Sequence, residues 1–194
     1  MAIKVVLLIG SGNSGKNTTL IQFCKFYGYK PKINKKGKEV FRRGKVILKG
    51  KINNKEVLIL PLTSSPQEKT DFCNVEKVKE IISKFMKNNK KTAKKEDYNE
   101  VLVIIAFTIR TYEGNIGEKC ITEPIDILIS EGYEIFKVYL KREDIPDFER
   151  IDNFVENKLK YDKLIISKKD EGIRQATELK EFVEDKVYGF STKS

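Results

Sequence analysis

The sequence of 194 residues contains no histidine and no tryptophan, and it has only three cysteines. The absence of histidine excludes Ser-His and Cys-His catalysis and every zinc site with a histidine ligand. Cys24, Cys73 and Cys120 show no CxxC spacing, and an odd set of this kind does not predict a secreted disulfide framework. We therefore expect a reducing, cytoplasmic environment, in which chemistry would use lysine, carboxylate, amide or hydroxyl groups or a bound metal.

Long apolar runs are also missing from the sequence. The first apolar run, from Ile3 to Ile9, is interrupted by Lys4 and is too short to span a membrane. It lacks the small-residue cleavage region of a signal peptide, and neither end of the sequence carries a lipidation motif. We expect this run to be a buried strand, and we expect no stable membrane anchor.

Acidic residues are scarce in two segments of a chain whose formal net charge is +10. Residues 30–51 contain ten Lys or Arg and one Glu, and residues 84–95 contain six Lys and no acid. Basic segments of this kind attract nucleic acid, an acidic membrane surface or an acidic protein. The solvated surface of a lysine-rich protein has the same composition, so the sequence leaves the partner open.

Runs of Val, Ile and Leu alternate with segments of helical periodicity, which is typical of an α/β domain. We expect one P-loop NTPase domain over residues 1–194, with a six-stranded, mostly parallel sheet, one antiparallel hairpin strand and helices on both faces. Strands are expected at residues 4–9, on both sides of a turn at Asn53 and Asn54, and at residues 101–107, 134–140 and 163–167. Helices are expected after residue 16 and at residues 75–85, 123–133, 151–159 and 173–187. The lysine-rich stretch around residue 90 is expected to be a flexible loop.

The segment after the first strand contains the pattern GxxxxGK from Gly10 to Lys16. In a P-loop, backbone N–H groups and the start of the next helix surround the phosphates of a nucleotide, and the lysine adds positive charge. A lysine in the first turn of a helix opposes the helix dipole unless an anion binds nearby, although a glycine-rich turn with a surface lysine is the simpler alternative. We expect the loop residues to bind phosphate: Gly10, Ser11, Gly12, Asn13, Ser14, Gly15, Lys16, Asn17 and Thr18.

Asn17 stands where a P-loop has the Ser or Thr that ligates Mg²⁺. Its amide oxygen can reach a metal ion, but its NH₂ group must then point away. We therefore expect a weakened Mg²⁺ site, with phosphate binding that depends less on the metal.

Three later segments stand at the positions of further motifs: TSSPQE at residues 63–68, KRED at 141–144 and SKKDEG at 167–172. With the loop and the order of elements, they make nearly the whole chain resemble the Ras-like small GTPases, in particular the prokaryotic gliding-motility (MglA-like) type. The resemblance implies GTP or GDP as the ligand and a switch that acts through a protein effector or regulator.

The resemblance also implies roles for residues near the γ-phosphate. It places Thr63 on the metal side and Gln67 beside the attacking water. Pro66 replaces the glycine whose N–H binds the γ-phosphate, and proline has no N–H to donate. In the first switch region the metal-sensing Thr is absent, and Arg42 and Arg43 are the candidates for arginine fingers. These departures imply slow or absent hydrolysis.

For the base, the resemblance places Asp144 where a carboxylate accepts hydrogen bonds from guanine, with Lys141 close to the base. Ser167, Lys168 and Lys169 would bring a backbone N–H near the guanine carbonyl. Asp144 is equally suitable as the N-cap of a following helix, so ATP remains an alternative ligand.

Three classes of function follow from these patterns. The first is a divergent small GTPase-like switch, or a pseudo-GTPase without turnover. The second is a small P-loop nucleotide kinase or phosphotransferase, although no carboxylate for an acceptor ends a buried strand. The third is a nucleotide-free scaffold or nucleic-acid-binding module that uses the basic segments. The hairpin favours the first class, because P-loop kinases usually have helical insertions there.

Overall fold

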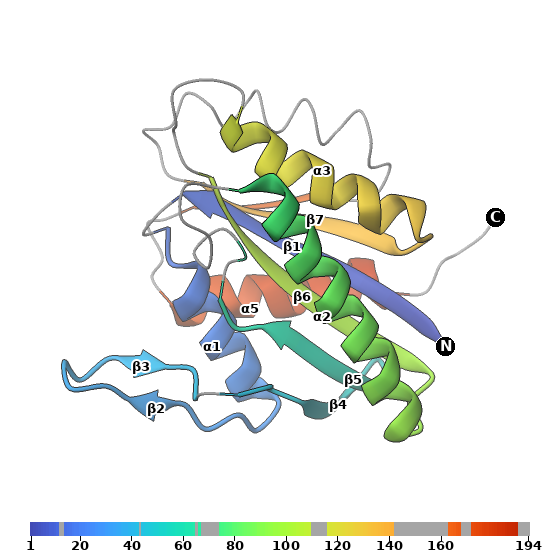
Figure 1. Ribbon diagram of the computed structural model, residues 1–194. Coiled ribbons are helices and arrows are strands. Elements are labelled where there is room, and N and C mark those ends of the chain that lie inside the picture. The colour runs from blue at the N-terminus through green and yellow to red at the C-terminus, as the bar shows by residue number, and fades with distance from the viewer. Residues whose placement is uncertain are drawn as a thin grey trace.

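A computed structural model of the protein describes residues 1–11, 14–42, 44–64, 66, 74–109, 116–141, 163–167 and 172–189. Its main sheet has the strand order β4-β5-β6-β1-β7-β8 (Figure 1). The strands of this sheet are β1 (Ala2–Ser11), β4 (Leu48–Ile52), β5 (Lys55–Leu62), β6 (Glu100–Ile109), β7 (Glu134–Lys141) and β8 (Lys163–Ser167). Among the described strands of this sheet, only β4 and β5 pair antiparallel. The expected mostly parallel sheet with one antiparallel strand is confirmed.

Helices cover both faces of the sheet, as expected (Figure 1). α2 (Val75–Lys95) and α3 (Ile116–Ser130) pack on one face. α1 (Lys16–Phe26), α5 (Ile173–Phe182) and the π-helical turn η2 (Val183–Val187) pack on the other. The described part of the protein therefore has three layers, with the sheet in the middle.

β1 lies inside the sheet and is buried on both of its faces. Val5 and Leu7 belong to the core under α2 and α3, whereas Val6 and Leu8 belong to the core under α1 and α5. All four side chains are fully buried. A parallel strand in this position reads as a continuous apolar run, which is why the sequence predicted it correctly.

The hairpin between β4 and β5 is confirmed. Asn53 and Asn54 form a two-residue turn with φ values of 47° and 64°. Positive φ at both central residues is the geometry of a type I′ turn, whose twist suits two antiparallel strands. Asparagine tolerates this conformation better than other residues with a side chain.

The prediction of a flexible loop around residue 90 is wrong, because residues 84–95 form the second half of α2. Lysine is a good helix former, and Ile82, Met86 and Ala93 continue one buried face along the helix. Asn74 caps the N-terminus by accepting a hydrogen bond from the Lys77 N–H at 3.0 Å. The high density of charge concealed a helical periodicity carried by few apolar residues.

A second, smaller hairpin lies between α1 and β4. Its strands are β2 (Lys32–Ile33) and β3 (Glu39–Val40), which pair antiparallel away from the main sheet (Figure 1). Asn34 organises the turn, since its side-chain oxygen accepts hydrogen bonds from the backbone N–H groups of Lys36 and Lys38. We call residues 30–42 the ribbon. The sequence did not predict these strands.

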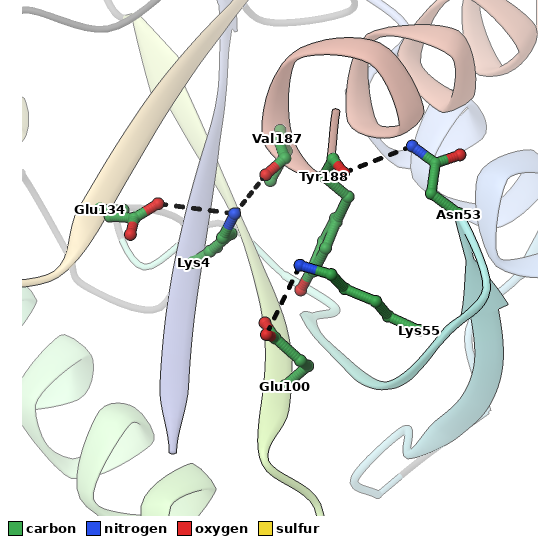
Figure 2. Close-up of polar contacts among 7 residues, drawn as sticks. All are labelled: Lys4, Asn53, Lys55, Glu100, Glu134, Val187 and Tyr188. Carbon is green, nitrogen blue, oxygen red and sulfur yellow. Dashed lines mark hydrogen bonds and ion pairs between the residues drawn. The ribbon is translucent and has the colours of Figure 1, made fainter. Parts of the chain in front are cut away.

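The last described segment is tied to the amino ends of the strands (Figure 2). The Lys4 ammonium donates to the Val187 carbonyl, lies 3.6 Å from the Glu134 carboxylate and sits 4.8 Å from the centre of the Tyr188 ring. From the β4–β5 turn, the Asn53 amide donates to the Tyr188 carbonyl at 3.4 Å. These contacts hold η2 against the sheet at the edge opposite to the glycine loop.

Several expectations concern other parts of the chain. The helix expected at residues 151–159 lies outside the described residues. Cys120 is disulfide-bonded, which the sequence did not predict, whereas Cys24 is free and buried. In the ranges that the structure covers, no helix is long and apolar enough to cross a membrane. The cytoplasmic location remains a prediction.

Burial of Cys24 generates a prediction about pH. Burial raises the pKa of the Cys24 thiol from 9.0 to about 12. Because the folded state holds the thiol neutral, its contribution to stability is complete below pH 9 and is lost as the pH rises toward 12. Relative to a Cys24→Ala variant, the wild type should lose about 1.4 kcal/mol of unfolding free energy between pH 7 and pH 10. Urea unfolding at both pH values, with reductant present, measures this; a constant difference between the two proteins would contradict it.

Candidate functional site

The glycine loop turns back over the carboxyl end of β1. A Cβ atom on Gly10 would lie 2.4 Å from the Ser14 hydroxyl oxygen and 3.2 Å from Leu140 of β7. Gly15 has a φ of 87°, a left-handed conformation that favours glycine. Both glycines are therefore required by the path of the chain.

Lys16 points into the curve of this loop. Its side chain is only 6% exposed, and its ammonium donates to the Gly10 carbonyl at 3.0 Å and to the Ser14 hydroxyl at 3.3 Å. The N-terminus of α1 contributes a second positive potential at the same place. The loop thus encloses positive charge, as a site for an anion requires.

The next residues of α1 differ in how far their side chains are buried. Asn17 and Thr18 are exposed, so their side chains are accessible to a ligand or metal ion. Thr19 is fully buried and donates from its hydroxyl to the side-chain oxygen of Gln175 at 2.7 Å. The same oxygen of Gln175 is 3.1 Å from the position that a Cβ on Gly15 would take.

Gln175 is a site residue that the sequence analysis missed. It is 2% exposed and belongs to the first turn of α5, more than 150 positions after the loop. Through Thr19 it joins the starts of α1 and α5 behind the loop. The available signal was a polar residue on the otherwise apolar face of a predicted helix.

The loop lies where the helices that follow two neighbouring strands pack on opposite faces of the sheet. β1 and β6 are neighbours, but α1 follows β1 on one face and α3 follows β6 on the other. In open α/β sheets, ligands bind in the crevice that forms outside the carboxyl ends of two such strands. The topology therefore supports a binding site at the loop, independently of its sequence pattern.

Thr108 of β6 is a second residue that the sequence analysis missed. It pairs with Gly10 in the parallel register of β6 and β1, and its side chain is 4% exposed. Alternation along β6 puts this side chain on the face that carries α1. A polar residue ending the apolar run at 101–107 was the signal that could have identified it.

Two residues expected near the base reach the same edge of the sheet. Leu140 pairs with Gly10, and the next residue, Lys141, pairs with Ser167. The backbone thus places both residues at the carboxyl edge: Lys141 is in the strand next to β1, and Ser167 is in β8, two strand spacings from β1. The remaining expected residues lie outside the described part of the chain: Gly12, Asn13, Arg43, Gln67, Asp144, Lys168 and Lys169.

Thr63, the second expected metal ligand, does not lie next to the loop in the strand register. Leu62, the last residue of β5, pairs with Ile105 of β6, which pairs with Leu7 of β1. Leu62 is thus two strand spacings, roughly 10 Å, from β1. Thr63 follows at this distance, whereas Thr108 is in the neighbouring strand.

Candidate metal ligands near the loop are neutral. The described side-chain oxygens in and around the loop include the amide of Asn17 and the hydroxyls of Ser14, Thr18 and Thr108. Within the described ranges, no three His, Cys, Asp or Glu side chains gather in a way that could hold a metal ion. A Mg²⁺ ion at the loop would depend on Asn17 and on oxygens of its ligand.

Comparison with known proteins adds no assignment. No protein-family model matches the sequence, and no curated protein matches it. The function is therefore inferred from the geometry of the loop and its surroundings.

The buried contact between Thr19 and Gln175 generates a second prediction. Thr19→Val removes the hydroxyl donor and should lower the free energy of unfolding by about 1–3 kcal/mol. In a double-mutant cycle with Gln175→Leu, the two side chains should show a coupling energy of about 1 kcal/mol. Urea unfolding of the four proteins measures it, and additive effects would contradict a direct hydrogen bond between α1 and α5.

Proposed function

We propose that the protein binds a nucleoside triphosphate or diphosphate through residues 10–18, with its phosphates in the curve of the loop. The observation that carries the proposal is the buried Lys16 ammonium, held against the Gly10 carbonyl and the Ser14 hydroxyl. A bound phosphate would offer this lysine charge-assisted hydrogen bonds, which are about twice as strong as neutral ones. The N-terminus of α1 and the divergence of β1 and β6 support the same location.

The broader function that we propose is a divergent GTPase-like switch, which acts through a protein effector or regulator and hydrolyses GTP slowly or not at all. Its support is the loop, the β4–β5 hairpin and the three later motifs in the sequence. Pro66, which cannot donate an N–H, is the reason to expect slow turnover. Even an intact small GTPase turns over alone at only about 10⁻⁴ s⁻¹.

The strand order does not add support to the Ras-like part of this proposal. In small GTPases the second strand of the hairpin pairs directly with the P-loop strand, whereas here β6 lies between β5, the second strand of the hairpin, and β1. Phosphate binding does not depend on this difference, because the loop, the lysine and the helix N-terminus are local. GTP and ATP must therefore both be tested.

The third prediction concerns Lys16. Titration calorimetry with GTP, GDP and ATP should show binding to the wild type, and Lys16→Ala should weaken it by roughly 10- to 150-fold, the value of losing a hydrogen bond to a charged group. Lys77→Ala is the matched control, because Lys77 is an exposed lysine in the first turn of α2. This control should bind like the wild type.

The outcomes separate the parts of the proposal. Selective binding of guanine nucleotides supports the GTPase-like switch, and selective binding of adenine nucleotides overturns that part alone. If inorganic triphosphate bound as tightly as any nucleotide, the base would contribute nothing to the affinity, and the proposed contacts with the base would be wrong. Absence of binding to all of these ligands would overturn the proposal.

The fourth prediction concerns the metal. With Asn17 in place of the usual hydroxyl, nucleotide affinity should differ less than about tenfold between Mg²⁺ and chelator, a difference of about 1.4 kcal/mol. Asn17→Ser should restore a hydroxyl ligand and increase this ratio. An unchanged ratio in the variant, or a large loss for the wild type in chelator, would show that Asn17 does not limit the metal site.

A further inference from the structure

The ribbon carries a concentration of positive charge without matching acids. Its six basic side chains are all exposed, and among the described residues none of them forms an ion pair or side-chain hydrogen bond. They are Lys30, Lys32, Lys35, Lys36, Lys38 and Arg42. The one acid of the ribbon, Glu39, is already engaged, since it accepts from Gln22 at 2.6 Å and from Lys25 at 2.9 Å. Both partners of Glu39 belong to α1, so the ribbon is anchored to the body while its own charges remain unpaired.

The ribbon also bears a hollow that is lined by basic and apolar side chains. The hollow has a volume of about 460 Å³. Lys32, Lys35 and Arg42 line it together with Val40 and Phe41. Tyr29 contacts two of these residues, because the centre of its ring lies 5.4 Å from that of Phe41 and its hydroxyl accepts from the Arg42 N–H at 2.8 Å.

The second half of α2 carries a further row of unpaired lysines. Five of its lysines are exposed and form no ion pair in the described structure: Lys84, Lys87, Lys91, Lys94 and Lys95. We call these five the lysine stripe. Intervals of three and four residues put most of them on one side of the helix, about 4.5–6 Å apart along its axis. A row of charges with this spacing suits a polyanion with regularly repeating phosphates.

Contacts of the segment between the ribbon and β5 connect the two sets of charges. The Lys45 ammonium donates to the Asn88 carbonyl of α2 at 3.4 Å, and the Lys49 ammonium lies 2.8 Å from the Glu96 carboxylate beyond its end. Lys51 of β4 is exposed. Because Lys45 and Lys49 of the connecting segment contact α2 or the residue after its end, we group the ribbon, these three lysines and the lysine stripe under one name, the basic band.

We propose that the basic band binds the phosphate backbone of a nucleic acid. A two-stranded ribbon fits the major groove of a duplex, which is about 12 Å wide, and a helix with a row of lysines can follow the adjacent phosphates. The hollow on the ribbon places Phe41 beside basic side chains, a combination that accepts a base next to its phosphate. This binding does not require the nucleotide site.

Other partners fit the basic band less well. The cores of protein interfaces are depleted in lysine, whereas lysine dominates here. An interfacial membrane segment needs a continuous apolar face, but Ile33, 56% exposed, is the only large apolar side chain strongly exposed on the described ribbon. Phosphate contacts by lysine need neither an aromatic interface core nor an apolar face.

The test measures binding by fluorescence anisotropy with a 20-base-pair duplex DNA and a 20-nucleotide single strand, at salt concentrations from 50 to 200 mM. About five phosphate contacts would give a slope near −4.5 for log K against log salt, a roughly 500-fold loss of affinity over this range. Lys32→Ala/Lys35→Ala and Lys87→Ala/Lys91→Ala should each weaken binding and make the slope shallower by about 1 to 2. The control is Lys119→Ala/Lys186→Ala, which removes the same charge from exposed positions outside the basic band and should bind like the wild type.

Each outcome decides the proposal. Salt-dependent binding of either nucleic acid that both band variants weaken and the control does not would support it. Equal weakening by the control would show that net charge alone is responsible and would overturn it. Absence of binding at 50 mM salt, or binding only to vesicles of anionic phospholipid, would overturn it as well. Lys16→Ala should leave the DNA affinity unchanged, so this proposal and the nucleotide site can fail separately.

Discussion

The arrangement of the described protein depends on the burial of β1 between two neighbours and two layers of helices. Because β1 is buried on both faces, the chain leaves the sheet only at the end of the strand. Gly10 lies close to this end and pairs with Thr108 on one side and with Leu140 on the other. The chain must then turn without a side chain at Gly10, because a Cβ there would meet Ser14. The turn starts α1, whose first residue, Lys16, is drawn back into the curve. The candidate site is thus a consequence of how the central strand ends.

The sequence predicted the elements whose physical cause is local. Continuous apolar runs predicted the strands of the parallel sheet, and Asn53 and Asn54 predicted the hairpin, because few residues adopt positive φ. The glycines from Gly10 to Gly15 predicted a turn between a strand and a helix, and the structure has β1 before this segment and α1 after it. The basic half of α2 was misread because Met86 and Ala93 carry a periodicity that the surrounding lysines obscure.

The order of strands and the residues around the loop could not be predicted in this way. β5, β6 and β7 each contain an apolar run, and no local property specifies which two of them lie beside β1. That order decides that Thr108, and not Thr63, is in the strand next to Gly10. Gln175 depends on the packing of α5 against α1, a contact between residues more than 150 positions apart. Site residues of this kind can be identified only from the assembled sheet and its helices.

The two proposed sites share α1, and the strength of that connection limits how much they can influence each other. α1 begins at the glycine loop and holds the ribbon through Gln22 and Lys25, which both contact Glu39. The Lys25 and Glu39 side chains are 39% and 31% exposed, and an ion pair of this kind contributes about 1 kcal/mol or less. A coupling free energy of about 1 kcal/mol corresponds to a change in affinity of only about fivefold. Through these contacts alone, a nucleotide at the loop could adjust binding at the basic band but could not switch it on or off.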